Sequence, residues 1–129
     1  MRQQFHRARH LSVVIFCAIV TLIVVSQPVA AQTLDDARRF LDTGRSSEAR
    51  AMLERIVSRS SDDPDALALL ARATFDGAQS QELYRQALNS SPSGNTAPSA
   101  LLAIADFYYA IGFYSNSHRL AQRVIDEFP

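Results

Sequence analysis

"SALLAIADFYYAIGFYSNSHRLAQRVIDEFP" covers Ser99–Pro129 and carries the clearest pattern in the chain. Large apolar residues alternate there with small ones, at spacings that fit neither an ordinary surface helix nor a strand. The small residues of the pattern are Ala105, Gly112, Ser117 and Ala121. Two helices can approach to about 8–10 Å only where their crossing carries small side chains. The stretch therefore predicts two closely packed helices.

The preceding sequence also predicts helices. Stretches rich in Ala, Leu, Arg and Glu, which are strong helix formers, lie between a few short segments that hold the Gly and Pro residues. Apolar residues recur at helical spacing in two early runs, Leu34-Ala37-Phe40-Leu41 and Ala49-Met52-Leu53-Ile56. No window alternates with a period of two for long enough to suggest a strand. The fold class expected is all-α.

Particular residues predict where these helices begin and end. Gly44 and Gly112 lie between two apolar-periodic helices, where a left-handed residue would end the first helix. Pro64 and Pro98 suit first helical turns, and Asp63 can cap the helix that Pro64 enters. The segments before these two prolines are therefore expected to be loops between helices.

The same landmarks define a repeat. Pro64 and Pro98 are 34 residues apart, and Gly44 and Gly112 differ by 68, twice that distance. A 34-residue helix–turn–helix unit is the period of the tetratricopeptide repeat (TPR). The last unit resembles this family at Leu101, Ile104, Ala105, Tyr108, Gly112, Ser117, Ala121, Val124 and Pro129.

The two earlier units resemble the family less closely. The first matches at Ala37, Phe40, Gly44, Ala49, Leu53 and Ile56, with Ser61 where the family has proline. In the middle unit Leu67, Leu70 and Ala71 fit, but Tyr84, Ala87 and Pro92 come three residues early. The resemblance implies a right-handed superhelical stack of about three repeats over residues 32–129, with units at approximately 33–63, 64–97 and 98–129.

Residues 1–31 are expected to be a secretory signal peptide. A basic start precedes an apolar run at residues 11–25, and Val29-Ala30-Ala31 supplies small residues for cleavage before Gln32. The alternative is an uncleaved anchor formed by residues 11–25, although a spanning helix needs about 20 apolar residues. Cleavage predicts a periplasmic protein. The anchor would hold it at the inner membrane.

The composition of the remaining 98 residues restricts the classes of partner and site. Loss of three arginines leaves 10 basic residues against 13 acidic ones, a net charge of −3, which does not suit nucleic acid or an anionic lipid surface. Cys17 lies in the apolar run, so the remaining residues hold no cysteine for disulfides or thiolate metal sites. We expect contact with a membrane only through the signal segment, if it is uncleaved.

No catalytic, cofactor or metal site is expected. His118 is the one histidine left after cleavage, and a catalytic histidine needs a partner and a cleft. No second histidine, cysteine nucleophile or Gly-rich phosphate loop accompanies it in residues 32–129. The chain is therefore not expected to be an enzyme.

A binding groove is what the resemblance implies instead. By the family's pattern, the groove positions are Arg38, Leu41, Asp42, Arg72, Phe75, Asp76, Asp106 and Tyr109. Arg38 and Arg72 are 34 residues apart and should line one wall, where guanidinium groups suit the carboxylates of a peptide. The alternative is that both arginines pair with nearby acids on a solvated surface.

A second candidate surface is the end of the last unit. A stack normally finishes with a polar capping helix, whereas this sequence stops at the family's terminal proline. The residues expected to be partly exposed are Leu120, Val124 and Phe128, joined by Tyr109 and Phe113. Such a patch predicts self-association or a partner at the C-terminal repeat, and the alternative is the front part of a longer solenoid.

The function expected is an exported protein-interaction module, an adaptor or scaffold for a peptide or protein partner. The last unit resembles repeats of periplasmic cell-envelope TPR proteins, such as the Tol-Pal coordinators and outer-membrane assembly lipoproteins. The alternative is a structural role, as the N-terminal part of a longer repeat protein or of an outer-membrane assembly.

Overall fold

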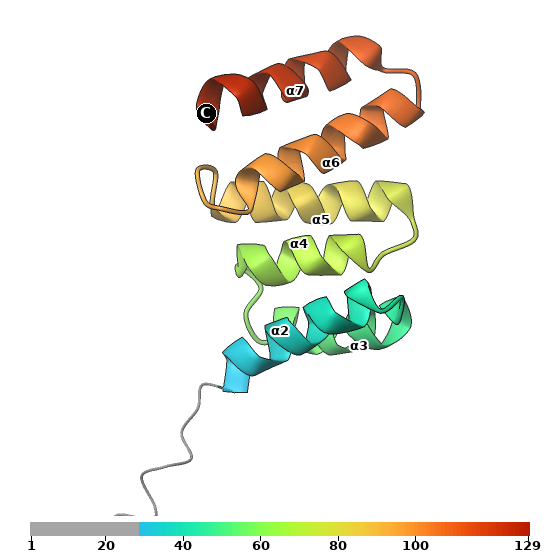
Figure 1. Ribbon diagram of the computed structural model, residues 1–129, viewed down its shortest axis with the longest axis vertical. Helices are drawn as coiled ribbons and strands as arrows, with labels where there is room; N and C mark the ends of the chain where they lie inside the picture. The colour runs from blue at the N-terminus through green and yellow to red at the C-terminus, as the bar shows by residue number, and fades with distance from the viewer. Residues whose placement is uncertain (1–28) are drawn as a thin grey trace, which may run out of the picture.

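The structure, a computed structural model, describes residues 29–129, with side chains from Leu34 onward. Six α-helices and no strand lie within these residues, which confirms the all-α prediction (Figure 1). The helices are α2 (Val29–Asp42), α3 (Ser46–Val57), α4 (Pro64–Arg72), α5 (Gly77–Ser90), α6 (Ala97–Ala110) and α7 (Tyr114–Glu127). The predicted apolar segment 11–25, and the signal peptide up to residue 28, lie outside the described residues.

The helices form three hairpins that stack along the long axis of the molecule. Each helix packs against its neighbours in sequence, and α2 also contacts α4. The three hairpin turns lie on one edge of the stack, and the connections between hairpins lie on the opposite edge (Figure 1). This arrangement is a stack of helix–turn–helix units, with α2–α3 and α6–α7 at its two ends.

The first and third hairpins turn in the same way. Gly44 and Gly112 have φ values of 77° and 84°, which confirms the predicted left-handed residues. The Arg45 amide donates to the Phe40 carbonyl and the Phe113 amide to the Tyr108 carbonyl, both at 2.8 Å. This bond, spanning five residues past a left-handed glycine, is a Schellman motif, which satisfies carbonyls that the helix end leaves free.

The middle hairpin turns differently. α4 ends at Arg72 and α5 begins at Gly77, three residues before the position that the 34-residue period from Ser46 would give. The Asp76 carboxylate caps α5 by accepting from the Gln79 amide at 2.7 Å. The predicted three-residue shift of the middle unit is therefore confirmed.

The predicted helix starts are also confirmed. The Asp63 carboxylate accepts from the amides of Asp65 and Ala66, at 3.0 and 3.2 Å, and Pro64 follows it in the first turn of α4. Pro98 lies in the first turn of α6. A proline costs no hydrogen bond there, because the first amides of a helix have no partner within the helix.

Small residues occupy the crossings of the hairpins. Ala37, Ala71 and Ala105, each 34 residues from the next, are at most 3% exposed. The Ser80 hydroxyl of α5 donates directly to the Ala71 carbonyl of α4 at 2.9 Å, so the two backbones are close at this point. Ala105 is thus buried as its spacing predicts, whereas Ser117 and Ala121 of the same pattern are half-buried.

Burial is concentrated in the first two hairpins and at the start of the third. Leu53, Leu67 and Leu101 are the largest fully buried side chains, and every residue from Ala66 to Ala71 is buried. In contrast, α7 contains no buried residue. The core therefore runs through the stack and thins toward α7.

Candidate functional site

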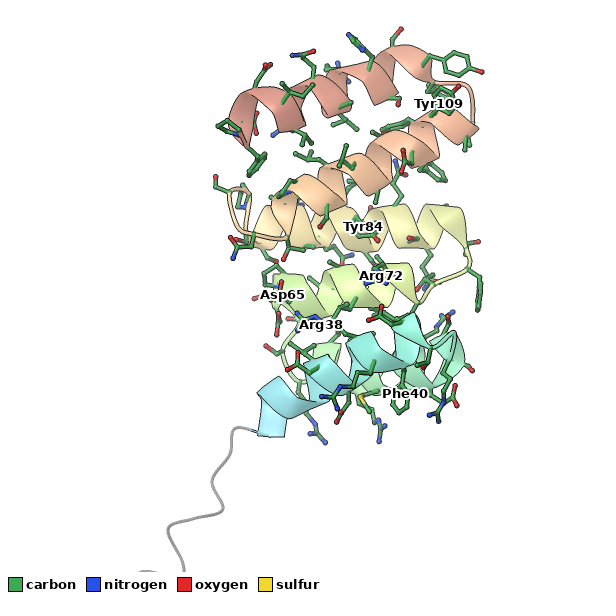
Figure 2. The ribbon with its side chains drawn as sticks, in the orientation of Figure 1. Arg38, Phe40, Asp65, Arg72, Tyr84 and Tyr109 are labelled. Atoms are coloured by element: carbon green, nitrogen blue, oxygen red, sulfur yellow. The ribbon has the colours of Figure 1, made fainter. Side chains whose placement is uncertain are left out.

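Two ion pairs join α2 to α4 on the surface that we call the first-helix face, formed by Arg38, Asp42, Asp65 and Arg72. The guanidinium of Arg38 on α2 lies 3.9 Å from the Asp65 carboxylate on α4. The guanidinium of Arg72 on α4 lies 3.5 Å from the Asp42 carboxylate on α2. Each helix thus supplies one base and one acid, and Figure 2 labels Arg38, Asp65 and Arg72 on this face.

The row continues toward the third hairpin. The Thr96 hydroxyl, at the start of α6, donates to the Asp65 carboxylate. Asp106 stands on α6 at the position of Arg38 and Arg72, is exposed, and makes no ion pair within residues 34–129. The first helices of all three hairpins therefore contribute charge to one surface, with arginines at one end and a free acid at the other.

Both arginines predicted to bind a peptide already have acidic partners. Arg38 also pairs with Asp35 on its own helix, at 2.7 Å. The side chains of Arg38 and Arg72 nevertheless remain 43% and 51% exposed. Exposed ion pairs of this kind contribute only about 0.2–1 kcal/mol each, so a ligand carboxylate could displace them at low cost.

Two predicted groove residues do not lie on a first helix. Because α4 ends at Arg72, Phe75 and Asp76 lie in the loop before α5 and not on a helix. Asp76 caps α5, and Phe75 is 85% exposed. At the corresponding positions Leu41 is half-buried in the core cluster and Tyr109 is 65% exposed.

Tyr84 of α5 lies close enough to Arg72 for the two groups to interact electrostatically (Figure 2). Burial raises the pKa of the Tyr84 phenol, and the positive charge of Arg72 opposes that rise. The phenol therefore stays protonated and neutral at neutral pH. It adds an uncharged polar group, and no further anion, to the surroundings of Arg72.

Aromatic side chains gather at the α6–α7 turn. The rings of Tyr109 and Tyr114 meet edge to face with centroids 5.2 Å apart, and those of Tyr108 and Phe113 are 6.2 Å apart. Tyr109, Phe113 and Tyr114 are 65%, 57% and 62% exposed. Neighbouring Ile111 is 49% exposed. Sequence reasoning selected Tyr109 and Phe113 but missed Ile111 and Tyr114, although the run Tyr108–Tyr114 contained the signal.

The α7 residues predicted to be partly exposed are so, and one further residue is more exposed. Leu120, Val124 and Phe128 are half-buried. The most exposed apolar side chain of α7 is Ile125, at 67%. Its counterpart in α3, Val57, packs against the cluster of the following hairpin formed by Leu67, Ala68 and Ala87. Ile125 therefore adds to the surface of α7 that would receive another helix.

Features typical of a catalytic site are few in the described part of the chain. No group of three or more His, Cys, Asp or Glu residues is placed there to hold a metal ion. A shallow depression of about 280 Å³ lies at the α6–α7 turn, lined by Gly112, Phe113, Tyr114, Ser115 and Asn116. The lining residues include no Asp, Glu, His, Lys or Arg, so the depression presents no carboxylate–imidazole or similar acid–base pair.

Within residues 29–129, no helix combines the length and the apolar character needed to cross a membrane. No protein-family model matches the sequence, and no curated protein is similar enough to match it. The surfaces described above are therefore the basis for assigning a function.

Proposed function

We propose that this protein is an exported TPR-like interaction module, an adaptor or scaffold that binds a peptide or protein partner in the bacterial cell envelope. The observation that carries the proposal is the first-helix face. Arg38 and Arg72 occupy equivalent positions on adjacent helices, and their inter-helix carboxylate partners lie at the long distances of 3.9 and 3.5 Å. Two half-exposed guanidinium groups on one rigid surface suit an acidic or carboxy-terminal peptide.

The rest of the face supports the same class of ligand. Tyr84 beside Arg72 offers a neutral hydroxyl, and exposed Tyr109 offers an apolar ring for a peptide side chain. Asp106, at the far end of the row, would favour a ligand whose distant end is basic or neutral. The ligand proposed is therefore an extended segment with its negative charge near α2 and α4.

The test is the double variant Arg38→Ala with Arg72→Ala, compared with Arg55→Ala and Arg59→Ala. Both pairs remove two positive charges, but the control residues lie on the exposed surface of α3 and just after it. Each variant is used to capture partners from an envelope extract at low and high salt. Captured peptides are then resynthesised with free and amidated carboxyl ends.

The first-helix variant should lose about 1.5–3 kcal/mol of binding for each charge-assisted contact removed, and the control variant should bind normally. Thermal unfolding should change little, because each lost surface pair is worth about 0.2–1 kcal/mol. If the double variant retains the same partners at equal strength, the arginines are only solvated surface and the proposal for this face is wrong.

Export is a separate part of the proposal. It rests on the predicted signal peptide, whose cleavage after Ala31 would leave most of α2 intact from Gln32 onward. Intact-mass measurement of protein recovered from the periplasm tests it. A mass that retains Met1–Ala31, with the protein in the membrane fraction, would favour the anchor formed by residues 11–25.

A further inference from the structure

The two arginines of the first-helix face are equivalent in position but not in surroundings. Arg38 faces two carboxylates, because its Nη1 donates to Asp35 at 2.7 Å and its Nη2 lies 3.9 Å from Asp65. Among the described side chains Arg72 faces one carboxylate, that of Asp42, with 3.5 Å between Nη2 and Oδ1. The Arg38 end of the face therefore carries a net negative charge, whereas Arg72 and Asp42 balance each other.

Both acids beside Arg38 are held in place. Asp65 directs Oδ2 toward Arg38, and its other oxygen accepts from the Thr96 hydroxyl at the start of α6. Asp35 lies one turn before Arg38 on α2, at a spacing that stabilises helix surfaces. A ligand carboxylate that approached Arg38 would meet two fixed like charges and would be repelled.

The acid beside Arg72 is held by that arginine alone. Asp42 is the last residue of α2, its side chain is 69% exposed, and it accepts no other side-chain hydrogen bond within the described residues. Only Nη2 of Arg72 contacts Asp42, so Nη1 and Nε are available to a ligand. The nearby Tyr84 phenol adds no charge, because burial raises its pKa.

A ligand carboxylate has more to gain at Arg72 than Asp42 has. Displacing Asp42 breaks one long, exposed ion pair, which is the weakest class of charged contact. A ligand that engages two guanidinium nitrogens forms a bidentate pair, which is shorter and stronger. The released Asp42 side chain returns to water, so no buried charge is left behind.

We propose that Arg72 is the anchor of the first-helix face, that it takes a single carboxylate, and that Asp42 is a built-in competitor which the ligand displaces. This inference rests on the proposed function and narrows it. The ligand is a segment that presents one carboxylate to Arg72, from a free carboxy terminus or from one acidic side chain. A run of acids gains nothing further, because Arg38 is already neutralised.

Carboxylate binding is measured on the full chain by NMR at constant ionic strength. The probes are acetyl-trialanine with a free carboxyl end, the same peptide amidated, and acetyl-Ala-Glu-Ala-amide. The first and third distinguish a carboxy terminus from an acidic side chain, and the second is the uncharged control. The Nε–H signal of Arg72 should shift with at least one charged probe, and that of Arg38 should not.

Substitutions separate the anchor from its neighbour, with the backbone amide signals of α2 and α4 reporting binding in every variant. Arg72→Gln should weaken binding about tenfold, whereas Arg38→Gln should change it no more than about twofold. Asp42→Asn should strengthen binding about two- to fivefold, because it removes the competitor. Asp126→Asn, at an exposed acid on α7, is the matched control and should leave binding unchanged.

A second set of peptides tests the single carboxylate. Acetylated peptides with glutamate at increasing distances from a free carboxyl end present two carboxylates at increasing separations, since an extended chain advances about 3.3–3.6 Å per residue. Each peptide should bind within about twofold of its glutamine counterpart. If Arg38 and Arg72 acted together, the peptide of matching length would bind at least about tenfold more tightly.

Failure of this inference is distinguishable from failure of the proposed function. Equal losses for Arg38→Gln and Arg72→Gln, a tighter peptide with two carboxylates, or no gain from Asp42→Asn would each contradict the single anchor and leave the proposed function standing. If neither arginine signal shifts with a charged probe, the first-helix face takes no carboxylate, and both proposals are wrong.

Discussion

α3 and α7 are equivalent helices of the first and third hairpins, yet they are buried very differently. Both follow a left-handed glycine, at Gly44 and Gly112, and begin 68 residues apart. α3 buries Ala49 and Leu53 completely, whereas the α7 counterparts, Ser117 and Ala121, are half-buried. The difference is that α4 packs on the second side of α3. Burial in this fold is therefore a property of the stack and not of the helix.

The largest expected effect is the difference in stability lost when a leucine is truncated in α3 and in α7. Leu53→Ala should cost about 2–5 kcal/mol, because it leaves a cavity in a fully enclosed site. Leu120→Ala should cost about 1 kcal/mol, since half-buried Leu120 already has part of its surface in water. Denaturant unfolding measures both values. Equal losses would mean that α7 is covered in solution as completely as α3.

The close crossing of α6 and α7 gives the next effect. Ala105→Leu should destabilise the fold by about 1–3 kcal/mol, because extra methylene groups must be forced between two helices. Ala110→Leu, on the exposed end of the same helix, is the control and should change stability by no more than about 0.5 kcal/mol. Thermal unfolding of the Ala105→Leu and Ala110→Leu variants measures the two changes in stability. A normal melting temperature for Ala105→Leu would rule out the close crossing.

The two hairpin turns should respond alike, although the helices after them are buried differently. Gly44→Ala and Gly112→Ala should each cost about 1–2 kcal/mol, because an L-residue is strained at the φ values of 77° and 84°. A Cβ atom would meet nothing within 4 Å at either position, so the backbone alone sets the cost. Clearly unequal losses, measured by denaturant unfolding, would mean that packing contributes at one turn.

The smallest effect concerns one glutamate on each helix. An Arg45 hydrogen bond lowers the pKa of Glu48 on α3, with help from the Glu48 amide, and an Arg123 hydrogen bond lowers the pKa of Glu127 on α7. A lowered pKa stabilises the fold above the ordinary value of 4.5, and this contribution is lost as the pH falls through the folded-state pKa.

Removing each arginine should distinguish the two sites. Arg123→Gln should return the pKa of Glu127 to its ordinary range, whereas Arg45→Gln should restore that of Glu48 only in part, because the backbone contribution remains. Carboxyl chemical shifts followed from pH 7 to pH 2 provide the measurement. Complete restoration at both sites would contradict the role assigned to the Glu48 amide.

Several features of the fold could be predicted because short-range chemistry decides them. Asp63 and Pro64 start a helix through a side-chain cap and a missing amide, and Gly44 and Gly112 end helices because they tolerate positive φ. The end of α4 at Arg72 could not be predicted by counting from the repeat. It places Phe75 and Asp76 in a loop, although they were expected at groove positions of a first helix.

The candidate site was predictable in position but not in pairing. The 34-residue spacing places Arg38 and Arg72 at equivalent positions on adjacent first helices. Asp42 and Asp65 become their partners only because α2 and α4 lie beside each other, which brings together residues about 30 positions apart. Counting along the chain does not show which acids face which bases.

The sequence by itself determined the all-α class, the three hairpins and the glycine turns of the first and third, because hydrophobic periodicity and local backbone chemistry act over a few residues. Only the tertiary structure decided which equivalent side chains are buried. Val57 is covered by the next hairpin and Ile125 is 67% exposed, although both are β-branched apolar residues at the same helix position. Exposure depends on which helix packs alongside, and that is a long-range property of the stack.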